Sequence, residues 1–185
     1  MTNLNSFNYF GWNVDDSDPL YKKLIIKNIN MTTEEEWIYK KISEKFLRNR
    51  RVALHIGSHY GFKSKILSEM FDTVHTFDFD NKINQFMKMN IKKFGIKNII
   101  IHPFGLGSEN KNVETTDYLE HKKINGPLSN HVVENPAGKY LVKKLDDLEI
   151  ADVDLMIVDT EGYELNVLKG AVETIKKFLP VIVME

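Results

Sequence analysis

The chain has 185 residues, of which 42% are hydrophobic, and this is enough to bury the core of one domain. Its 25 Lys and Arg nearly balance its 26 Asp and Glu, so charge gives no electrostatic case for a nucleic-acid partner. Because the chain has no cysteine, disulfides, a thiolate nucleophile and a cysteine-based zinc site are excluded.

The chain begins MTNLNSFNYF, which lacks the basic-then-apolar layout of a secretory signal. No apolar run approaches the ~20 residues that a membrane helix needs. The sequence therefore predicts a soluble cytoplasmic protein with no membrane partner.

Residues 1–31 mix Asn, Asp and aromatic residues without a clean period, and two interpretations stay open. The segment is either an arm packed on the domain, or a lid or dimer-contact segment. Residues 32–185 are predicted to form a single domain. A helix is predicted to begin at Thr33, with Glu36 completing a capping box. Its apolar face is formed by Trp37, Ile38, Ile42, Phe46 and Leu47.

From residue 52 onward, strand-like runs alternate with helix-length segments. Strands are predicted at 52–56, 73–79, 98–102, 154–158 and 181–184. Helices are predicted at 62–70, 83–94 and 165–179, with a short helix at 145–150 and an irregular stretch at 107–140. This order predicts an α/β fold, a doubly wound and mainly parallel sheet with helices on both faces.

In such a sheet the carboxyl ends of the strands meet at one edge, which is where ligands bind. That edge is predicted to collect five groups of residues: His55 to His59, Asp78 to Asp80, Pro103 to Gly105, Asp159 to Gly162, and Glu185.

The first of these groups is a glycine-bearing turn, in which Gly57 and Gly61 flank Ser58, His59 and Tyr60. Glycine allows a sharp bend and the close approach of a ligand to the main chain. The spacing G-x-x-x-G does not meet the G-x-G-x-x-G fingerprint of nicotinamide cofactors. A tight turn with a purely structural role is the alternative.

The second strand ends in Phe77-Asp78-Phe79-Asp80. An acidic residue there, about 20 residues past the glycines, is placed to accept hydrogen bonds from ribose hydroxyls. Helix capping is the alternative for either aspartate. We assign capping to Asp80 and ligand binding to Asp78.

The later group, Asp159-Thr160-Glu161-Gly162, places two carboxylates after a buried strand and before a helix. Helix N-termini favour negative charge, so capping is one explanation of Glu161. Asp159 ends an apolar strand at the predicted crevice, where a functional role is the better explanation.

The run IVDTEGYELNVLKGA resembles the hallmark of the FkbM-type methyltransferases, an aliphatic strand followed by D-x-E-G-x-E-x-x-V-L-K-G-A. VALHIGSHYGF is similar to that family's D-x-G-A-N-x-G turn, and the chain also resembles the family at Phe77-Asp78, at Leu145 to Leu148 and at Pro180 to Glu185. The resemblance implies the class I methyltransferase fold and S-adenosylmethionine as cofactor.

The resemblance also implies roles for individual residues. The turn of Gly57, Ser58, His59 and Gly61 would hold the methionine part of the cofactor. Asp78 would bind the ribose, with Phe79 beside it in the cofactor site. Gly105 and Leu106 would contact the adenine. Asp159 would lie near the sulfonium and the methyl acceptor.

The sequence departs from the family in two ways. His55 and His59 stand where the family has Asp and Asn. The sequence also reaches only the fifth strand, whereas class I methyltransferases add two more as an antiparallel hairpin. An uncovered strand at 181–184 would be an exposed sheet edge, which dimerisation or the N-terminal arm would cover.

The leading functional hypothesis is an O-methyltransferase that acts on a hydroxyl of a sugar, glycan or other small acceptor. Asp159, Glu161 or a loop histidine such as His121 or His131 would take the hydroxyl proton. No metal is predicted. Two alternatives stay open: a non-catalytic binding or assembly module that keeps this fold, and a nicotinamide-dependent oxidoreductase.

Overall fold

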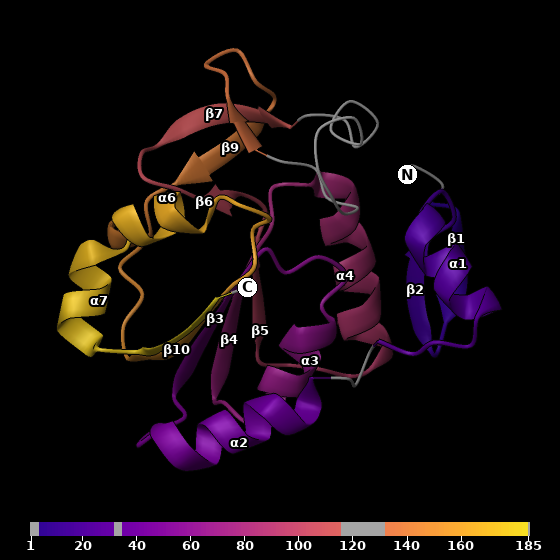
Figure 1. Ribbon diagram of the computed structural model, residues 1–185, viewed down its shortest axis with the longest axis horizontal. Helices are drawn as coiled ribbons and strands as arrows, with labels where there is room; N and C mark the ends of the chain where they lie inside the picture. Colours follow the sequence, from indigo (N-terminus) through magenta and orange to yellow (C-terminus); the bar gives the residue numbers. More distant parts are fainter. Residues whose placement is uncertain (1–3, 32–34, 116–131, 185) are drawn as a thin grey trace.

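Five parallel strands form the central sheet of the computed structural model, which describes residues 4–31, 35–115 and 132–184 (Figure 1). They are β3 (Val52–Ile56), β4 (Thr73–Phe77), β5 (Ile99–His102), β10 (Val153–Val158) and β11 (Val181–Met184), and their order is β11-β10-β3-β4-β5. The chain winds outward from β3 to β5 and then returns to pair β10 with β3. The strand order therefore reverses between β3 and β10, where open α/β sheets bind ligands.

Helices cover both faces of this sheet, as predicted. α2 (Glu36–Phe46) and α3 (Phe62–Ser68) contribute to a cluster with Ala53 on one face. α6 (Glu164–Lys169) and α7 (Val172–Phe178) contribute to a cluster with Leu54 and Ile56 on the other. Because β3 is buried on both faces, its sequence is a continuous apolar run interrupted only by His55.

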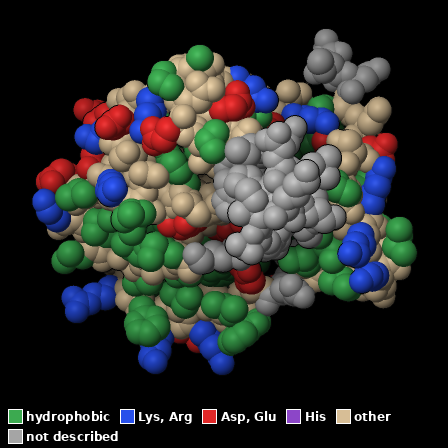
Figure 2. All heavy atoms as spheres, turned by 45° about the horizontal axis from the view of Figure 1, so that its top comes forward, with side chains coloured by type: hydrophobic (Ala, Val, Ile, Leu, Met, Phe, Trp, Pro, Cys, Tyr) green, Lys and Arg blue, Asp and Glu red, His purple; other side chains and the backbone are tan. Residues whose placement is uncertain are grey.

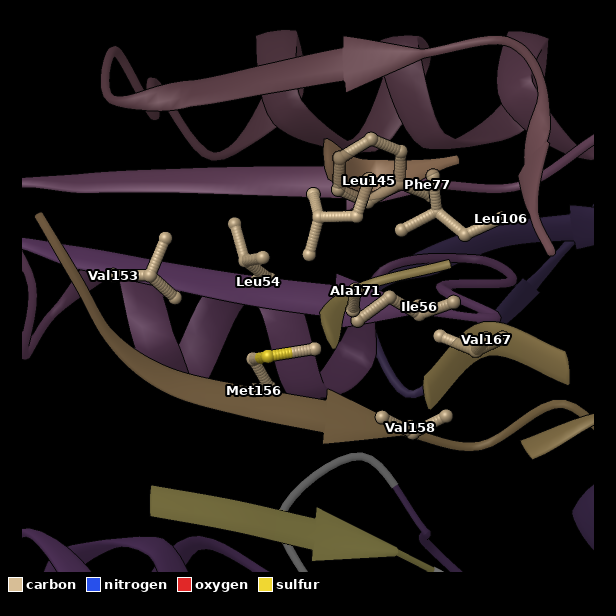
Figure 3. Packing of buried hydrophobic residues seen from close by; sticks show 10 residues of the cluster. All are labelled: Leu54, Ile56, Phe77, Leu106, Leu145, Val153, Met156, Val158, Val167 and Ala171. Atoms are coloured by element: carbon tan, nitrogen blue, oxygen red, sulfur yellow. The ribbon is translucent and has the colours of Figure 1, made fainter. Parts of the chain in front are cut away.

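The second of these clusters is the larger part of the core (Figure 3). Side chains from β3, β4 and β10 meet Val167 and Ala171, and Leu145 of the 3₁₀ helix η1 (Leu145–Asp147) joins them. Burial of this apolar surface fixes the register of the parallel strands, since a slip by one residue would turn each side chain to the other face.

The stretch predicted to be irregular, 107–140, contributes β7 (Lys111–Thr115) and β8 (Val132–Glu134) to a second sheet, so that prediction is wrong for these strands. The sheet comprises β6 (Gly105–Leu106), β7, β8 and β9 (Tyr140–Lys143), in the order β6-β9-β7-β8. Figure 1 shows this sheet at the top, above the central sheet. Buried Val113 and Val142 anchor it, but each strand is too short for alternation to be recognised. The predicted turn at Asn125-Gly126-Pro127 lies outside the described residues.

The N-terminal segment forms a hairpin and a helix: β1 (Ser6–Tyr9), β2 (Trp12–Asp15) and α1 (Pro19–Ile26). They pack beside α4 (Asn81–Lys93), at the right of Figure 1, through an aromatic cluster that includes Tyr9, Trp12 and Phe86. The Asn90 side chain accepts from the Asn13 amide at 2.8 Å and donates to the Asn13 carbonyl at 3.1 Å. The sequence predicted no elements here, because four-residue strands show no usable period.

The helix predicted from Thr33 is present, and its predicted apolar face is confirmed in part, since Ile42 and Leu47 pack against the core. α2 buries Tyr39 and Ser43, whereas Trp37 and Phe46 are 59% and 58% exposed. Thr33 lies outside the described residues, so the predicted capping box is not tested.

The helix predicted over 165–179 is instead two helices, α6 and α7, separated at Gly170 and Ala171. A Cβ at Gly170 would meet the Gly107 carbonyl oxygen at 1.9 Å, so the main chain of the second sheet packs against the break. Asp146 then starts α7 by accepting from the Thr174 amide at 2.8 Å. Leu165 and Leu179, which fit the helical spacing, are 64% and 80% exposed. Figure 2 shows exposed hydrophobic side chains among charged ones on one face of the molecule.

Within the described ranges, no helix combines the length and the apolar character needed to cross a membrane.

Candidate functional site

A cavity of about 700 Å³ lies at the carboxyl edge of the central sheet. It is lined by nearly all of the residues predicted for the site: Gly57, Ser58, His59, Asp78, Phe79, Gly105, Leu106, Asp159 and Glu161. Gly61 lies behind this lining, where its left-handed backbone (φ +91°) precedes α3 and packs on Met87. The topology therefore brings together residues up to a hundred positions apart.

Gly57, in the first turn, packs directly against the second turn of the cavity, which is Asp159 to Gly162. Its φ is +81°, and a Cβ there would lie 1.7 Å from the Asp159 carbonyl oxygen. The main chains are held by the Gly57 amide, which donates to Phe77 at 2.9 Å, and by the Asp159 amide, which donates to Ile56 at 3.0 Å. Only glycine fits this position, for conformational and for steric reasons.

Asp78 connects the first turn to the next loop. Its carboxylate accepts from the His59 amide at 3.0 Å and from the Asp80 amide at 2.9 Å. Burial raises the pKa of Asp78, and the amide hydrogen bonds counteract only part of that rise. The loop begins two residues earlier than predicted, because β4 ends at Phe77.

Asp80 caps the following helix, as predicted. Its carboxylate accepts from the Lys82 amide at 2.7 Å and from the Ile83 amide at 3.1 Å, at the start of α4. Ligand binding by Asp78 stays a prediction, since its two loop contacts show only that it shapes the cavity.

Lys63, which the sequence analysis did not single out, is the main cation in the cavity. Its Nζ lies 2.7 Å from an Asp159 carboxylate oxygen and 3.3 Å from a Glu35 carboxylate oxygen. Burial alone would lower the pKa of Lys63, but the hydrogen bond and charge of Asp159, followed by Glu35, outweigh it and raise the pKa. Lys63 therefore stays charged beside the residue predicted to lie near the reacting atoms.

His55, in the position where the family has aspartate, is 2% exposed and lines the cavity. Burial, reinforced by the charge of Lys63, lowers the pKa of His55 to about 3, so the ring is neutral near pH 7. Its Nδ1 lies 2.7 Å from the Ser64 hydroxyl, and its Nε2 has no hydrogen-bond partner in the described part of the chain.

The Ser64 hydroxyl is the hydrogen-bond partner of His55 Nδ1. Ser64 is fully buried, and the imidazole is the partner that its hydroxyl has among the described residues. A buried hydroxyl that donates to nothing costs about 1–3 kcal/mol. In the tautomer with the ring proton on Nε2, the hydroxyl donates to Nδ1 and avoids this cost.

The second turn is closed by Glu164, a residue of the family motif. One of its carboxylate oxygens accepts from the Thr160 amide, the Thr160 hydroxyl and the Gly162 amide, each at 3.0 Å. Burial would raise the pKa of Glu164, but these donors outweigh it and lower the pKa. The turn places Glu161 at the exposed rim of the cavity with a left-handed backbone (φ +56°).

The N-terminal segment forms another wall of the cavity, with Asp15, Asp18 and Tyr21 among the lining residues. Tyr21 stacks on the His59 ring at 5.9 Å between centroids, and the Tyr60 hydroxyl donates to Asp18 at 3.0 Å. No local sequence signal identifies these residues, because their partners lie about forty positions away.

Two further histidines of the central sheet lie apart from the cavity, and three predicted residues lie outside the described part of the chain. His75 and His102 are half-buried, and His75 Nδ1 lies 2.9 Å from His102 Nε2, away from the cavity lining. His121, His131 and Glu185 lie outside the described residues. Within the described ranges, no group of three or more His, Asp or Glu residues is placed to hold a metal.

Comparison with known families identifies a match over most of this chain. A family model described as a methyltransferase FkbM domain matches residues 55–185. The chain belongs to the FkbM methyltransferase family. The match begins at His55, so the N-terminal wall of the cavity lies outside it.

Solved structures show the same fold for this FkbM family member. The crystal structure of methyltransferase FkbM from Methylobacillus flagellatus is similar with a TM-score of 0.52 and 18% identity, over 74% of this chain. The chain spans about a third of that relative, with 32% of it covered. The predicted family and doubly wound fold are therefore confirmed.

Two further structures are similar at lower scores. One is a SAM-dependent methyltransferase from Aquifex aeolicus, with a TM-score of 0.47 and 18% identity over 86% of this chain and 70% of the other. The other is a putative methyltransferase from Streptococcus mutans in complex with SAH, with a TM-score of 0.47 and 11% identity over 80% and 69%. No curated protein matches the chain at a significant level.

Proposed function

We propose that this FkbM-family protein binds S-adenosylmethionine and transfers its methyl group to a hydroxyl of a small acceptor such as a sugar. The observation that supports this most directly is the single cavity that unites Gly57, Asp78 and Asp159 at the carboxyl edge of a parallel sheet.

The residues present fit the cofactor. Gly57 lines the cavity and lets the first turn pack directly on the second, because a side chain there would collide with Asp159. Asp78 presents a carboxylate suited to ribose hydroxyls. At Gly105 a Cβ would lie 3.0 Å from the Phe79 ring, so the glycine lets the main chain pack closely on that ring, and both residues line the cavity where the adenine is expected.

When bound, the cofactor supplies a methyl group on a positively charged sulfur. The chain must hold the acceptor oxygen in line with that methyl group and remove the hydroxyl proton. Asp159 and Glu161 are the candidate carboxylates. Asp159 is engaged by Lys63, whereas Glu161 is exposed at the rim. We therefore assign proton removal to Glu161 and positioning of the methyl donor to Asp159.

The acceptor side of the cavity is formed by the N-terminal segment. Tyr21 provides an aromatic face, and Asp15 and Asp18 provide hydrogen-bond acceptors. Aromatic faces together with carboxylates suit a polyhydroxylated acceptor, because hydroxyls donate to carboxylates while the ring covers an apolar sugar face.

Isothermal titration with S-adenosylmethionine tests the cofactor. We expect binding by the folded protein and at least about tenfold weaker binding by Asp78→Asn, which replaces a charged acceptor by a neutral one. Asp72→Asn is the matched control, since Asp72 is exposed at the opposite end of the same strand. Lack of binding at millimolar cofactor would refute the proposal, and tight binding of NADH instead would favour an oxidoreductase.

Release of S-adenosylhomocysteine during incubation with a panel of sugars and small alcohols tests the transfer. We expect Glu161→Gln to lower turnover by about 10²-fold or more while cofactor affinity stays unchanged. Cofactor binding without transfer to any acceptor would favour the non-catalytic alternative.

A further inference from the structure

We infer that this chain binds the amino-acid group of the cofactor mainly through its carboxylate. Lys63 and the Nε2–H of His55 donate hydrogen bonds to that carboxylate, and Asp159 accepts from the ammonium. This rests on the proposed function. This mode of binding differs from the one that the family resemblance implies. There, an aspartate at the position of His55 helps bind the amino-acid group.

Lys63 supplies the charge for a carboxylate. It follows the first turn directly, at the second residue of α3, and its side chain is 23% exposed. An ammonium has three donors, and the described contacts use two of them, one to Asp159 and one to Glu35. The third is available to a ligand that enters beside Asp159.

His55 supplies a second donor. The buried ring is neutral, and the tautomer in which the Ser64 hydroxyl donates to Nδ1 carries its proton on Nε2, the atom without a partner in the described part of the chain. Buried polar atoms are rarely left without a partner, so an unpartnered one in a cavity wall points to a bound group. A neutral donor next to Lys63 suits an anionic oxygen and not an ammonium.

The charged residues around Lys63 suit a ligand that carries one carboxylate and two positive charges. One lysine faces two carboxylates, Asp159 and Glu35, which leaves one negative charge in excess. The cofactor carries an ammonium, a carboxylate and a sulfonium. Its ammonium pairs with Asp159 and its carboxylate with Lys63, so the ion pair between these residues is exchanged for two pairs to the ligand.

The test compares two ligands that differ only in the group at issue, S-adenosylmethionine and decarboxylated S-adenosylmethionine. Isothermal titration of the unmodified protein should show at least about tenfold weaker binding of the decarboxylated ligand, because its carboxylate contacts to charged donors are lost. This comparison needs no variant, so it does not depend on the folding of any mutant.

Variants then assign the contacts. Lys63→Met should weaken binding of S-adenosylmethionine by about tenfold and change that of the decarboxylated ligand by less than about threefold. Lys65→Met is the matched control on the same helix, since Lys65 pairs with Glu69 and does not line the cavity. Far-ultraviolet circular dichroism confirms that each variant is folded.

Two replacements separate the nitrogens of His55. His55→Gln places an amide donor near the position of Nε2, whereas His55→Asn reaches only the position of Nδ1 beside Ser64. We expect His55→Gln to bind S-adenosylmethionine more tightly than His55→Asn, by about threefold or more. The opposite order would show that the Ser64 contact and not the donor in the cavity controls binding, which overturns the assignment of His55.

Other outcomes overturn the inference or its foundation. Equal affinity of the unmodified protein for both ligands, or equal weakening of both by Lys63→Met, would refute recognition of the carboxylate and leave the proposed function standing. Absence of binding of either ligand to the folded protein would refute the proposed function itself.

Discussion

The two turns that line the cavity are held in shape by different means. The second turn is closed from within, because Glu164 accepts three hydrogen bonds from residues two to four positions before it. The first turn depends on distant residues. Asp78 holds the His59 amide, Asn90 donates to the Tyr60 carbonyl at 3.3 Å, and Asp18 accepts from the Tyr60 hydroxyl.

This difference explains why the second turn carries a recognisable sequence motif and the first does not. A turn closed by its own residues must keep them at fixed spacing, so its sequence is recognisable. A turn closed by other segments leaves its own residues freer to vary, provided that the glycines stay. His55, where the resemblance implies an aspartate, lies in β3 directly before the first turn and not in the second.

Gly57→Ala should produce the largest effect, because Gly57 is where the two turns touch. The added Cβ would lie 1.7 Å from the Asp159 carbonyl oxygen, at a φ of +81° that disfavours alanine. We expect a loss of about 3 kcal/mol or more in the free energy of unfolding, measured with urea. Gly95→Ala is the control, since its φ is +66° in open space and only the conformational cost of about 1 kcal/mol applies. Equal losses would show that the turns are not in tight contact.

The pH dependence of the free energy of unfolding should show the second largest effect, because His55 beside the first turn and Glu164 in the second titrate in different pH ranges. The pKa of His55 falls from 6.5 to about 3 on folding. The unfolded chain therefore binds more protons between these values, and stability is lost as the pH falls below 6.5. One such group contributes up to ~1.4 kcal/mol per pH unit. Glu164 acts the same way only in stronger acid, below its unfolded pKa near 4.5.

Urea denaturation at pH 6.5 and pH 5 measures this slope. His55→Gln should flatten it, because glutamine does not titrate. The lowered pKa values of His75 and His102 add a contribution of the same sign as His55, and the raised pKa of Asp78 acts in the opposite direction. An unchanged slope in His55→Gln would contradict burial of a neutral imidazole beside the first turn.

Glu164→Ala should have the smallest effect of the three, because Glu164 is partly exposed. Removal of a charged acceptor from three donors should cost about 1 kcal/mol in the free energy of unfolding, because water can replace part of what a half-buried carboxylate provides. Glu173→Ala, an exposed residue paired with Lys176 on α7, should cost less than about 0.5 kcal/mol. If the two losses are equal, Glu164 does not close the second turn.

The sequence predicted the central sheet well, because buried parallel strands such as 52–56 and 154–158 are continuous apolar runs. It predicted neither the second sheet nor the N-terminal hairpin, whose short strands carry too few residues for alternation to be seen. It also predicted one long last helix where the structure has two. The helical spacing of Leu165 and Leu179 suggested a buried face that is in fact exposed, and close packing at Gly170 divides the segment.

Prediction of the site followed the same pattern. The residues next to strand ends, such as Gly57, Asp78 and Asp159, could be found because parallel topology brings all such ends to one edge. Lys63 could not, because its partner Asp159 lies 96 positions away and a lone lysine early in a helix is unremarkable. The role of Tyr21 likewise depends on tertiary contact with His59.

The contact between the N-terminal hairpin and α4 has a consequence for biosynthesis. Asn13 and Asn90 are 77 positions apart. At translation rates of about 5–20 residues per second, Asn13 leaves the ribosome roughly 4–15 seconds before Asn90. During that interval Tyr9 and Trp12 lack the α4 surface on which they are finally buried. The hairpin is thus made first and docked late, and its aromatic side chains gain their final partners only after α4 has been synthesised.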